Sequence, residues 1–273
     1  MSAASTPEVE RTVGFRDPAA LDVPWPDDAT RDRLVGDWWF YQRRGGHRTS
    51  TDDLVTAYSA ARHGGASPAR YADIGCGIGS VLLTTAYALR PGESLGVEAQ
   101  EQSAAMAARS IAELPDDAPP IRVLRGDLRD AKTETLGRFD LITGSPPYLP
   151  LGTGSLSPDP QRQACRFELR GGVEAYAEAA AALLTEEGTF HLVFQTQWNP
   201  RVEDALTQAG LTAFARTDFA MRTGRAPFLS VFAARRGPAR AEVAVERIDV
   251  RDADGERTAA YQAVRERVGH ARD

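Results

Sequence analysis

The chain has little lysine, cysteine and histidine, and each shortage excludes a class of site. Lys132 is the single lysine, so arginine supplies all but one of the 32 basic residues. Two cysteines, Cys76 and Cys165, are too few for a disulfide framework, and neither has a cysteine or histidine at metal-ligand spacing. The four histidines are scattered along the sequence. We therefore expect no metal centre and no disulfide scaffold.

Long apolar runs are also missing. No stretch reaches the roughly 18 apolar residues of a membrane-spanning helix, and residues 1–10 are polar, unlike a secretory signal. These features predict a cytoplasmic protein without membrane contact, and we expect a monomer. The net charge of −6 argues against a polybasic coat but leaves room for a local basic face.

Strand-like and helix-like segments alternate along most of the 273 residues. This alternation is typical of βαβ units and predicts an α/β fold with a seven-stranded, mostly parallel sheet and helices on both faces. The last two strands, LTAFARTDFA and FLSVFAARR, are separated by a short loop, so one of them is expected to run antiparallel.

Composition divides the chain into four expected regions. Residues 1–30 read as a flexible lead-in, and residues 31–68 as a helical, basic segment with Thr51 as a helix N-cap. Residues 69–236 form the expected core, and residues 237–273 a small appendage packed on its edge.

A glycine-rich turn follows the first strand of this core. Residues 73–79 read DIGCGIG, and acidic residues end the next two strands at Glu98 and Asp127. Glycines let a backbone approach a ligand closely, and the following helix N-terminus offers free N–H groups. A carboxylate at Glu98 could accept both ribose hydroxyls of an adenosine. A nicotinamide dinucleotide remains an alternative, although GxGxG departs from its GxGxxG spacing, and so does a purely structural turn.

A second motif, Gly144-Ser145-Pro146-Pro147-Tyr148, ends the fourth core strand. Two prolines build a rigid loop and aim the carbonyls of Ser145 and Pro146. A hydroxyl and a carbonyl can together accept both N–H groups of a planar amine, and Tyr148 offers a face for stacking. Such acceptors favour a tetrahedral nitrogen when the amine acts as a nucleophile.

These two motifs resemble class I S-adenosylmethionine-dependent methyltransferases, and the second resembles the (Asn/Asp/Ser)-Pro-Pro-(Tyr/Phe) signature of amino-methyltransferases. The resemblance implies a Rossmann-like fold and S-adenosyl-L-methionine as cofactor. Asp73 and the glycines would line its methionine part, Glu98 would hold the ribose, and Asp127 with the Leu128 backbone would read the adenine. This chain has serine at position 145, where asparagine is commonest in the family.

Two flanking segments narrow the resemblance. Residues 41–53, YQRRGGHRTSTDD, and residues 164–168, ACRFE, are similar to segments of the tRNA(Val) adenine-N6-methyltransferase group. The likeness covers roughly residues 35–265 and departs at Ser145 and in the glycine- and proline-rich insert 149–160. It would place Arg48 and Asp52 near the cofactor and make Glu168 a loop anchor.

The expected site residues fall into three groups. The catalytic group comprises Ser145, Pro146, Pro147 and Tyr148. The cofactor group comprises Arg48, Asp52, Asp73, Gly75, Cys76, Gly77, Gly79, Glu98, Ala99, Asp127, Leu128 and Ser145. The substrate group comprises Arg43, Arg44, Tyr148 and Glu168.

Charge is segregated along the chain. Residues 31–48 hold five arginines and two aspartates, and residues 216–240 hold six arginines and one aspartate. Such segments suit RNA phosphates. The resemblance then implies a tRNA or another structured RNA as partner, with adenine N6 of a tRNA anticodon-loop base as methyl acceptor. Methylation of a protein glutamine amide or of a small-molecule amine remains an alternative. A catalytically inactive RNA-binding protein that keeps the cofactor fold is another.

Overall fold

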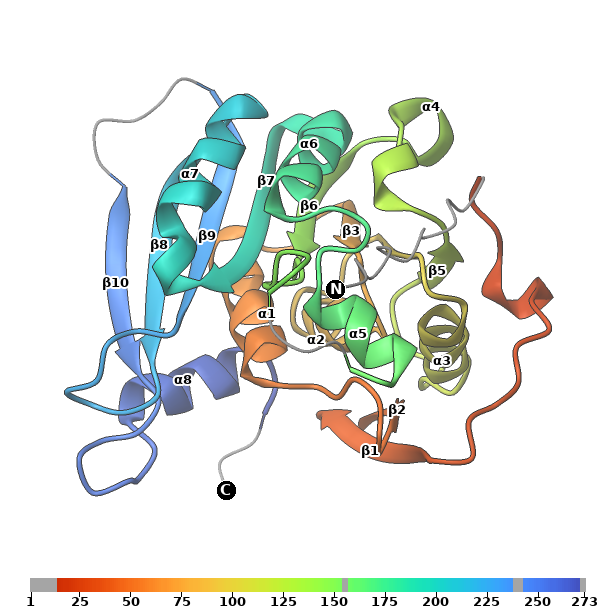
Figure 1. The fold of residues 1–273 in the computed structure, drawn as a ribbon, viewed down its shortest axis with the longest axis horizontal. Helices are drawn as coiled ribbons and strands as arrows, with labels where there is room; N and C mark the ends of the chain where they lie inside the picture. Colours follow the sequence, from red (N-terminus) through yellow and green to blue (C-terminus); the bar gives the residue numbers. More distant parts are fainter. Residues whose placement is uncertain (1–13, 154–156, 238–242, 271–273) are drawn as a thin grey trace, which may run out of the picture.

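A computed structural model describes residues 14–153, 157–237 and 243–270 (Figure 1). Its centre is an eight-stranded sheet in the order β5-β4-β3-β6-β7-β9-β8-β10, in which β9 alone is antiparallel to both of its neighbours. The strands are β3 (Arg70–Ile74), β4 (Glu93–Glu98), β5 (Ile121–Arg125), β6 (Phe139–Gly144), β7 (Leu184–Gln195), β8 (Leu211–Ala220), β9 (Leu229–Arg236) and β10 (Ala244–Asp249).

The expected fold class is confirmed, with one strand more than predicted. The additional strand is β10, which the sequence placed in a separate appendage. It pairs in parallel with β8 and extends the core sheet at its left end in Figure 1. The turn after β8 also returns the chain as the antiparallel strand β9, as the short connection indicated.

Helices cover both faces of the sheet. They are α1 (Thr51–His63), α2 (Ser80–Leu89), α3 (Glu101–Ala112), α4 (Thr133–Leu136), α5 (Pro160–Arg166), α6 (Val173–Leu183), α7 (Asn199–Gln208) and α8 (Ala259–Arg267). α6 and α7 pack together over one large apolar cluster, whereas α1 packs against α2 and α8 on the other face. None of the helices in the described ranges is long and apolar enough to cross a membrane.

The expectation of a helical segment over 31–68 holds for α1, but the residues before α1 form a β-hairpin. β1 (Ala29–Val35) and β2 (Trp38–Arg43) pair antiparallel. The residues alternate between faces: Trp38 and Phe40 are fully buried against α2 and α3, whereas Trp39 is 41% exposed. Period-two burial of adjacent aromatics suits a strand and not a helix.

Two smaller expectations also change. Residues 1–13 of the predicted lead-in lie outside the described residues, but the rest of it packs on the core: Arg16 pairs with Arg125 of β5, and Phe15 packs against the large cluster. The N-cap of α1 is Ser50, not Thr51, and its amide donates to Asp53 Oδ2 at 2.8 Å. The N3 position of Asp53 therefore completes a capping box.

Candidate active site

One pocket opens at the carboxyl ends of β3, β4 and β6, where ligand crevices of open α/β sheets lie. It gathers residues from the glycine turn, the ends of β4 and β5, the loop after β6 and the start of α1. Of the expected residues, its lining contains Asp52, Asp73, Gly75, Cys76, Gly77, Glu98, Ala99, Asp127, Leu128, Ser145, Pro146, Pro147 and Tyr148.

The glycine turn between β3 and α2 needs glycine for steric reasons. Gly75, Gly77 and Gly79 all have positive φ, at +72°, +56° and +89°. A Cβ on Gly75 would lie 2.1 Å from the Tyr176 hydroxyl, whereas one on Gly77 would meet nothing within 4 Å. Gly79 is the N-cap of α2, next to Ala107 of α3, and does not line the pocket. Gly79 thus packs between helices in this structure, and its expected cofactor contact stays a prediction.

Asp73 is a buried acid with an unsatisfied oxygen. Its Oδ1 accepts from Thr143 Oγ1 at 2.7 Å, and its Oδ2 has no hydrogen-bond partner among the described residues. Burial raises the pKa of Asp73 to about 8. A cationic ligand group in the pocket would satisfy Oδ2 and stabilise the ionised carboxylate.

Glu98 lies at the end of β4, and burial raises its pKa. Its Oε2 accepts from the Gly77 amide at 2.8 Å and its Oε1 from the Gln100 amide at 2.7 Å. These two bonds aim the carboxylate along the glycine turn. Each oxygen keeps a lone pair that can accept from a ligand hydroxyl.

Asp127 caps the short helix η2 (Leu128–Asp130) and is paired with Arg129, whose guanidinium contacts both carboxylate oxygens at 2.9 and 2.5 Å. Burial favours the protonated acid, but the Arg129 bonds outweigh it, so the pKa of Asp127 is lowered. Asp127 therefore stands ionised at the pocket rim, with Ala99 and Leu128 supplying apolar lining between β4 and β5.

Ser145 begins the Pro-Pro loop after β6 and lines the pocket. Its hydroxyl is buried and has no hydrogen-bond partner among the described residues. Leaving such a group unpaired costs about 1–3 kcal/mol. A free acceptor in a rigid loop is the arrangement that an incoming N–H donor requires.

Tyr148 closes the same loop and connects it to α1. Its hydroxyl donates to Asp52 Oδ2 at 2.5 Å, and its ring meets Phe194 edge-on at 5.1 Å. Burial and the Asp52 carboxylate raise the pKa of Tyr148, so the phenol stays neutral. The Asp52 bond holds the ring in place at the pocket.

The start of α1 adds lining residues that the sequence motifs did not identify: His47, Ser50 and Asp53. Burial disfavours the charged form of His47, but the neighbouring Cys165, Asp53 and Asp52 favour it and raise its pKa to about 9. The sequence shows the TDD motif at residues 51–53, directly after a basic segment. That His47 and Asp53 face a glycine turn about 25 residues later depends on how α1 packs.

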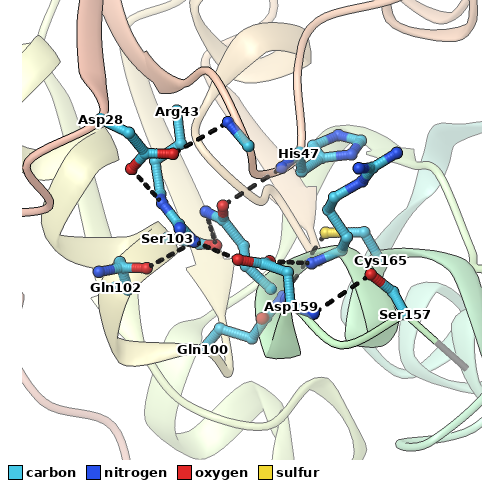
Figure 2. Close-up of polar contacts among 12 residues, drawn as sticks. Asp28, Arg43, His47, Gln100, Gln102, Ser103, Ser157, Asp159 and Cys165 are labelled. Carbon is cyan, nitrogen blue, oxygen red and sulfur yellow. Dashed lines mark hydrogen bonds and ion pairs between the residues drawn. The ribbon is translucent and has the colours of Figure 1, made fainter.

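A strap, residues 157–170, roofs the pocket with Ala164, Cys165 and Arg170. It contains α5, and Figure 2 shows how polar contacts hold it against the N-terminal hairpin and α3. Buried Gln161 accepts from the His47 amide at 3.2 Å and donates to Ser103 Oγ at 3.0 Å. A Cβ at Gly46 would lie 2.1 Å from Gln161 Oε1 and 2.8 Å from Arg43 Cβ, so a larger residue here would displace Gln161 or the chain.

Arg43, which the sequence predicted as a substrate ligand, is the ionic centre of this contact. Its Nε pairs with Asp28 and its Nη1 with Asp159, each at 2.8 Å, and Nη1 also donates to Gln102 (Figure 2). With 17% of its side chain exposed, the guanidinium is occupied by protein partners. Arg44 projects from the next position and is exposed.

Two other predicted site residues, Arg48 and Glu168, are not among the residues that line this pocket. Arg48 lies on the hairpin side and faces Asp32 at 3.5 Å, with 44% of its side chain exposed. Glu168 pairs with Arg201 of α7, which also binds Glu174. Glu168 thus ties the end of the strap to α7 and does not face the substrate space.

The pocket is rich in carboxylates. Asp52, Asp53, Asp73, Glu98 and Asp127 line it, with His47 and Arg170 as its basic residues. Such a lining suits a ligand that carries cationic groups and ribose hydroxyls, and it disfavours the pyrophosphate of a dinucleotide. Within the described ranges no group of His, Cys, Asp and Glu residues could hold a metal ion. The fold and this pocket define a class, the S-adenosylmethionine-dependent methyltransferases.

Comparisons with known proteins narrow the class. The chain is 30% identical over 198 residues to the tRNA1(Val) (adenine(37)-N6)-methyltransferase of Escherichia coli O157:H7, covering 71% of this chain and 78% of that protein. The protein of the same name from Shigella sonnei is 31% identical over the same shares. The chain belongs to this family of methyltransferases. No family profile matches it.

Solved structures support the fold. A predicted O-methyltransferase from Agrobacterium tumefaciens aligns with a TM-score of 0.60 at 22% identity, covering 81% of this chain and 98% of that one. A T. thermophilus 16S rRNA N2 methyltransferase, in complex with AdoMet and guanosine, aligns with a TM-score of 0.52 at 18% identity, covering 79% of this chain and 52% of that one.

Proposed function

We propose that this methyltransferase modifies N6 of an adenine in a tRNA anticodon loop. The observation that carries the proposal is the buried, unpartnered Ser145 hydroxyl, which lines the same pocket as Glu98. The family relatives, named for adenine N6 of tRNA1(Val), support the choice of acceptor. A tRNA partner would also place the protein in the cytoplasm.

In this proposal, different carboxylates bind different parts of the cofactor. Glu98 would accept from the ribose hydroxyls, Asp73 Oδ2 would receive the ammonium of the methionine part, and Ala99 with Leu128 would pack against the adenine. S-adenosylmethionine supplies an electrophilic sulfonium methyl group. The glycine turn lets the chain approach it closely, because Gly77 has no Cβ and opens onto free space.

The Pro-Pro loop acts on the acceptor. Ser145 Oγ and the Pro146 carbonyl each accept a hydrogen bond from one N–H group of the exocyclic amine. These bonds draw the nitrogen lone pair out of conjugation with the ring. Tyr148, braced by Asp52, stacks on the adenine after the base leaves its stack in the loop. Holding amine and methyl donor in line supplies the rest of the rate acceleration.

Unmodified tRNA transcripts test this proposal. We would incubate the purified protein with S-adenosylmethionine and a pool of transcripts, digest the RNA and analyse its nucleosides by mass spectrometry. The expected product is N6-methyladenosine. Methyl transfer to a protein or small-molecule fraction without RNA labelling would refute the acceptor, and absence of cofactor binding by calorimetry would refute the cofactor site.

A further inference from the structure

The strap over the pocket presents two arginines that form no ion pair with the described acids. Arg162 and Arg166 lie one helical turn apart on α5, and both are exposed. Neither guanidinium has an ion pair among the described residues, whereas the acids of the strap are engaged elsewhere. Asp159 pairs with Arg43, and Glu168 pairs with Arg201. The outer face of the strap is therefore positive in a chain that is acidic overall.

This face stands beside the acceptor motif. The Leu149 amide, directly after Tyr148, donates to the Arg166 carbonyl at 3.0 Å, and the Glu168 amide donates back to Leu149 at 3.0 Å. The same helix lines the pocket through Ala164 and Cys165. A molecule bound to the arginines would thus lie at the pocket mouth. Arg44 is exposed two residues before Gly46, which packs against Gln161 of this helix.

We propose that Arg162 and Arg166, flanked by Arg44, bind phosphates of the RNA strand whose base enters the pocket. This inference rests on the proposed function, because it assumes an RNA acceptor. Side chains four residues apart on a helix are about 5–6 Å apart at Cβ, so the pair can contact neighbouring phosphates. Guanidinium forks bind phosphate oxygens in pairs. The strap then has two ligands, the cofactor beneath and the RNA above.

The double variant Arg162→Gln/Arg166→Gln tests the strap face, because glutamine keeps helix propensity and removes the charge. Binding of an unmodified tRNA transcript would be measured from about 50 to 250 mM salt. We expect about tenfold weaker binding at low salt, and a salt slope reduced by roughly 1.5, since each single-strand phosphate contact contributes about 0.7. Cofactor affinity by calorimetry should stay unchanged and would show that the variant is folded.

Two further variants complete the experiment. Arg122→Gln removes an exposed arginine near the start of β5, away from the pocket end of the strands, and should leave RNA binding as in the parent. Arg222→Gln/Arg225→Gln removes two exposed arginines from the loop between β8 and β9. If the strap variant binds RNA as tightly as the parent, the inference is overturned, whether or not the loop variant loses affinity. RNA methylation by the parent would still uphold the proposed function in that case. A parent that binds the cofactor but neither binds nor methylates RNA would refute the function itself.

Discussion

Two residues of this pocket carry a buried polar atom without a hydrogen-bond partner among the described residues, and Thr85, Ser94, Asn199 and Arg236 carry others outside it. Asp73 Oδ2 and Ser145 Oγ are both buried without partners and line one cavity. Each such atom costs about 1–3 kcal/mol when it stays unpaired. Asp73 lies just before the glycine turn and Ser145 in the Pro-Pro loop. This separation fits a pocket in which one ligand pairs with Asp73 and a second ligand pairs with Ser145.

The ionisation of Asp73 predicts a pH dependence of cofactor binding. Its pKa is raised to about 8 by burial, so the unliganded acid is mostly protonated at neutral pH. An ammonium partner favours the carboxylate, so binding expels the proton and affinity should rise with pH. Calorimetry should show an increase approaching tenfold per pH unit between about pH 6 and 7.5. Asp73→Asn should bind weakly and without this slope, and an equal slope in the variant would contradict the assignment.

Tyr148 predicts a separation between turnover and cofactor binding. Tyr148→Ala removes the stacking face and should lower kcat by about 5- to 150-fold, the scale of 1–3 kcal/mol for base stacking. Cofactor affinity should change little. Tyr148→Phe keeps the ring but loses the bond to Asp52, so it should retain much of the activity. Equal losses of turnover and cofactor affinity in Tyr148→Ala would argue against an acceptor-side role.

Among the elements, the strap depends on contacts from distant parts of the chain. β2 supplies Arg43, the turn after it packs against Gln161, and α7 supplies Arg201. The strap itself is short, and its helix α5 spans Pro160–Arg166. A helix this short is not stable alone, so these contacts hold it over the pocket.

Loosening the strap should speed release of the cofactor. In Asp159→Asn the side-chain oxygen can still cap α5 at the Arg162 amide, but the ion pair with Arg43 is lost. We expect cofactor dissociation to accelerate about three- to tenfold in stopped-flow measurements, because the pair is partly buried. Asp249→Asn breaks an exposed pair with Arg247 and serves as the matched control. Identical cofactor dissociation rates in both variants would contradict a role of the Asp159–Arg43 ion pair in retaining the cofactor.

At the scale of the whole molecule, α1 joins the site to the global fold. Its first turn lines the pocket, and its later residues pack against α2, α8 and the strands β7 and β9. Ser59 in α1 contacts the fully buried His191 of β7 at 2.8 Å, and Thr189 contacts the other ring nitrogen at 3.1 Å. The imidazole is therefore a neutral link between helix and sheet.

His191 predicts loss of stability in acid. Burial, assisted by the charge of His63, lowers its pKa to about 3. The unfolded chain binds the proton near pH 6.5 and the native chain does not, so stability falls as pH drops from about 6.5 toward 3. Urea unfolding should show this decline, and His191→Gln should flatten it. A variant with the same acid decline as the parent would show that other groups cause it.

Local motifs predicted much of the site. Glu98, Asp127 and the Ser145–Tyr148 loop reach one pocket because parallel strands end at the same edge of a sheet. The arginines were less predictable. Arg43 and Arg44 are neighbours with the same charge, but β2 turns the first inward to Asp28 and Asp159 and leaves the second exposed. Net charge per segment does not contain that information.

The sequence by itself determined the sheet class, the glycine turn and the Pro-Pro loop, because each follows from local periodicity, steric demand or a short motif. Tertiary structure alone decided that WWFY forms a hairpin strand, that β10 joins the core sheet, and that a strap with Arg162 and Arg166 roofs the pocket. These outcomes depend on which surfaces meet across long chain separations. Burial and ion pairing between such surfaces are set by packing, and no local pattern encodes them.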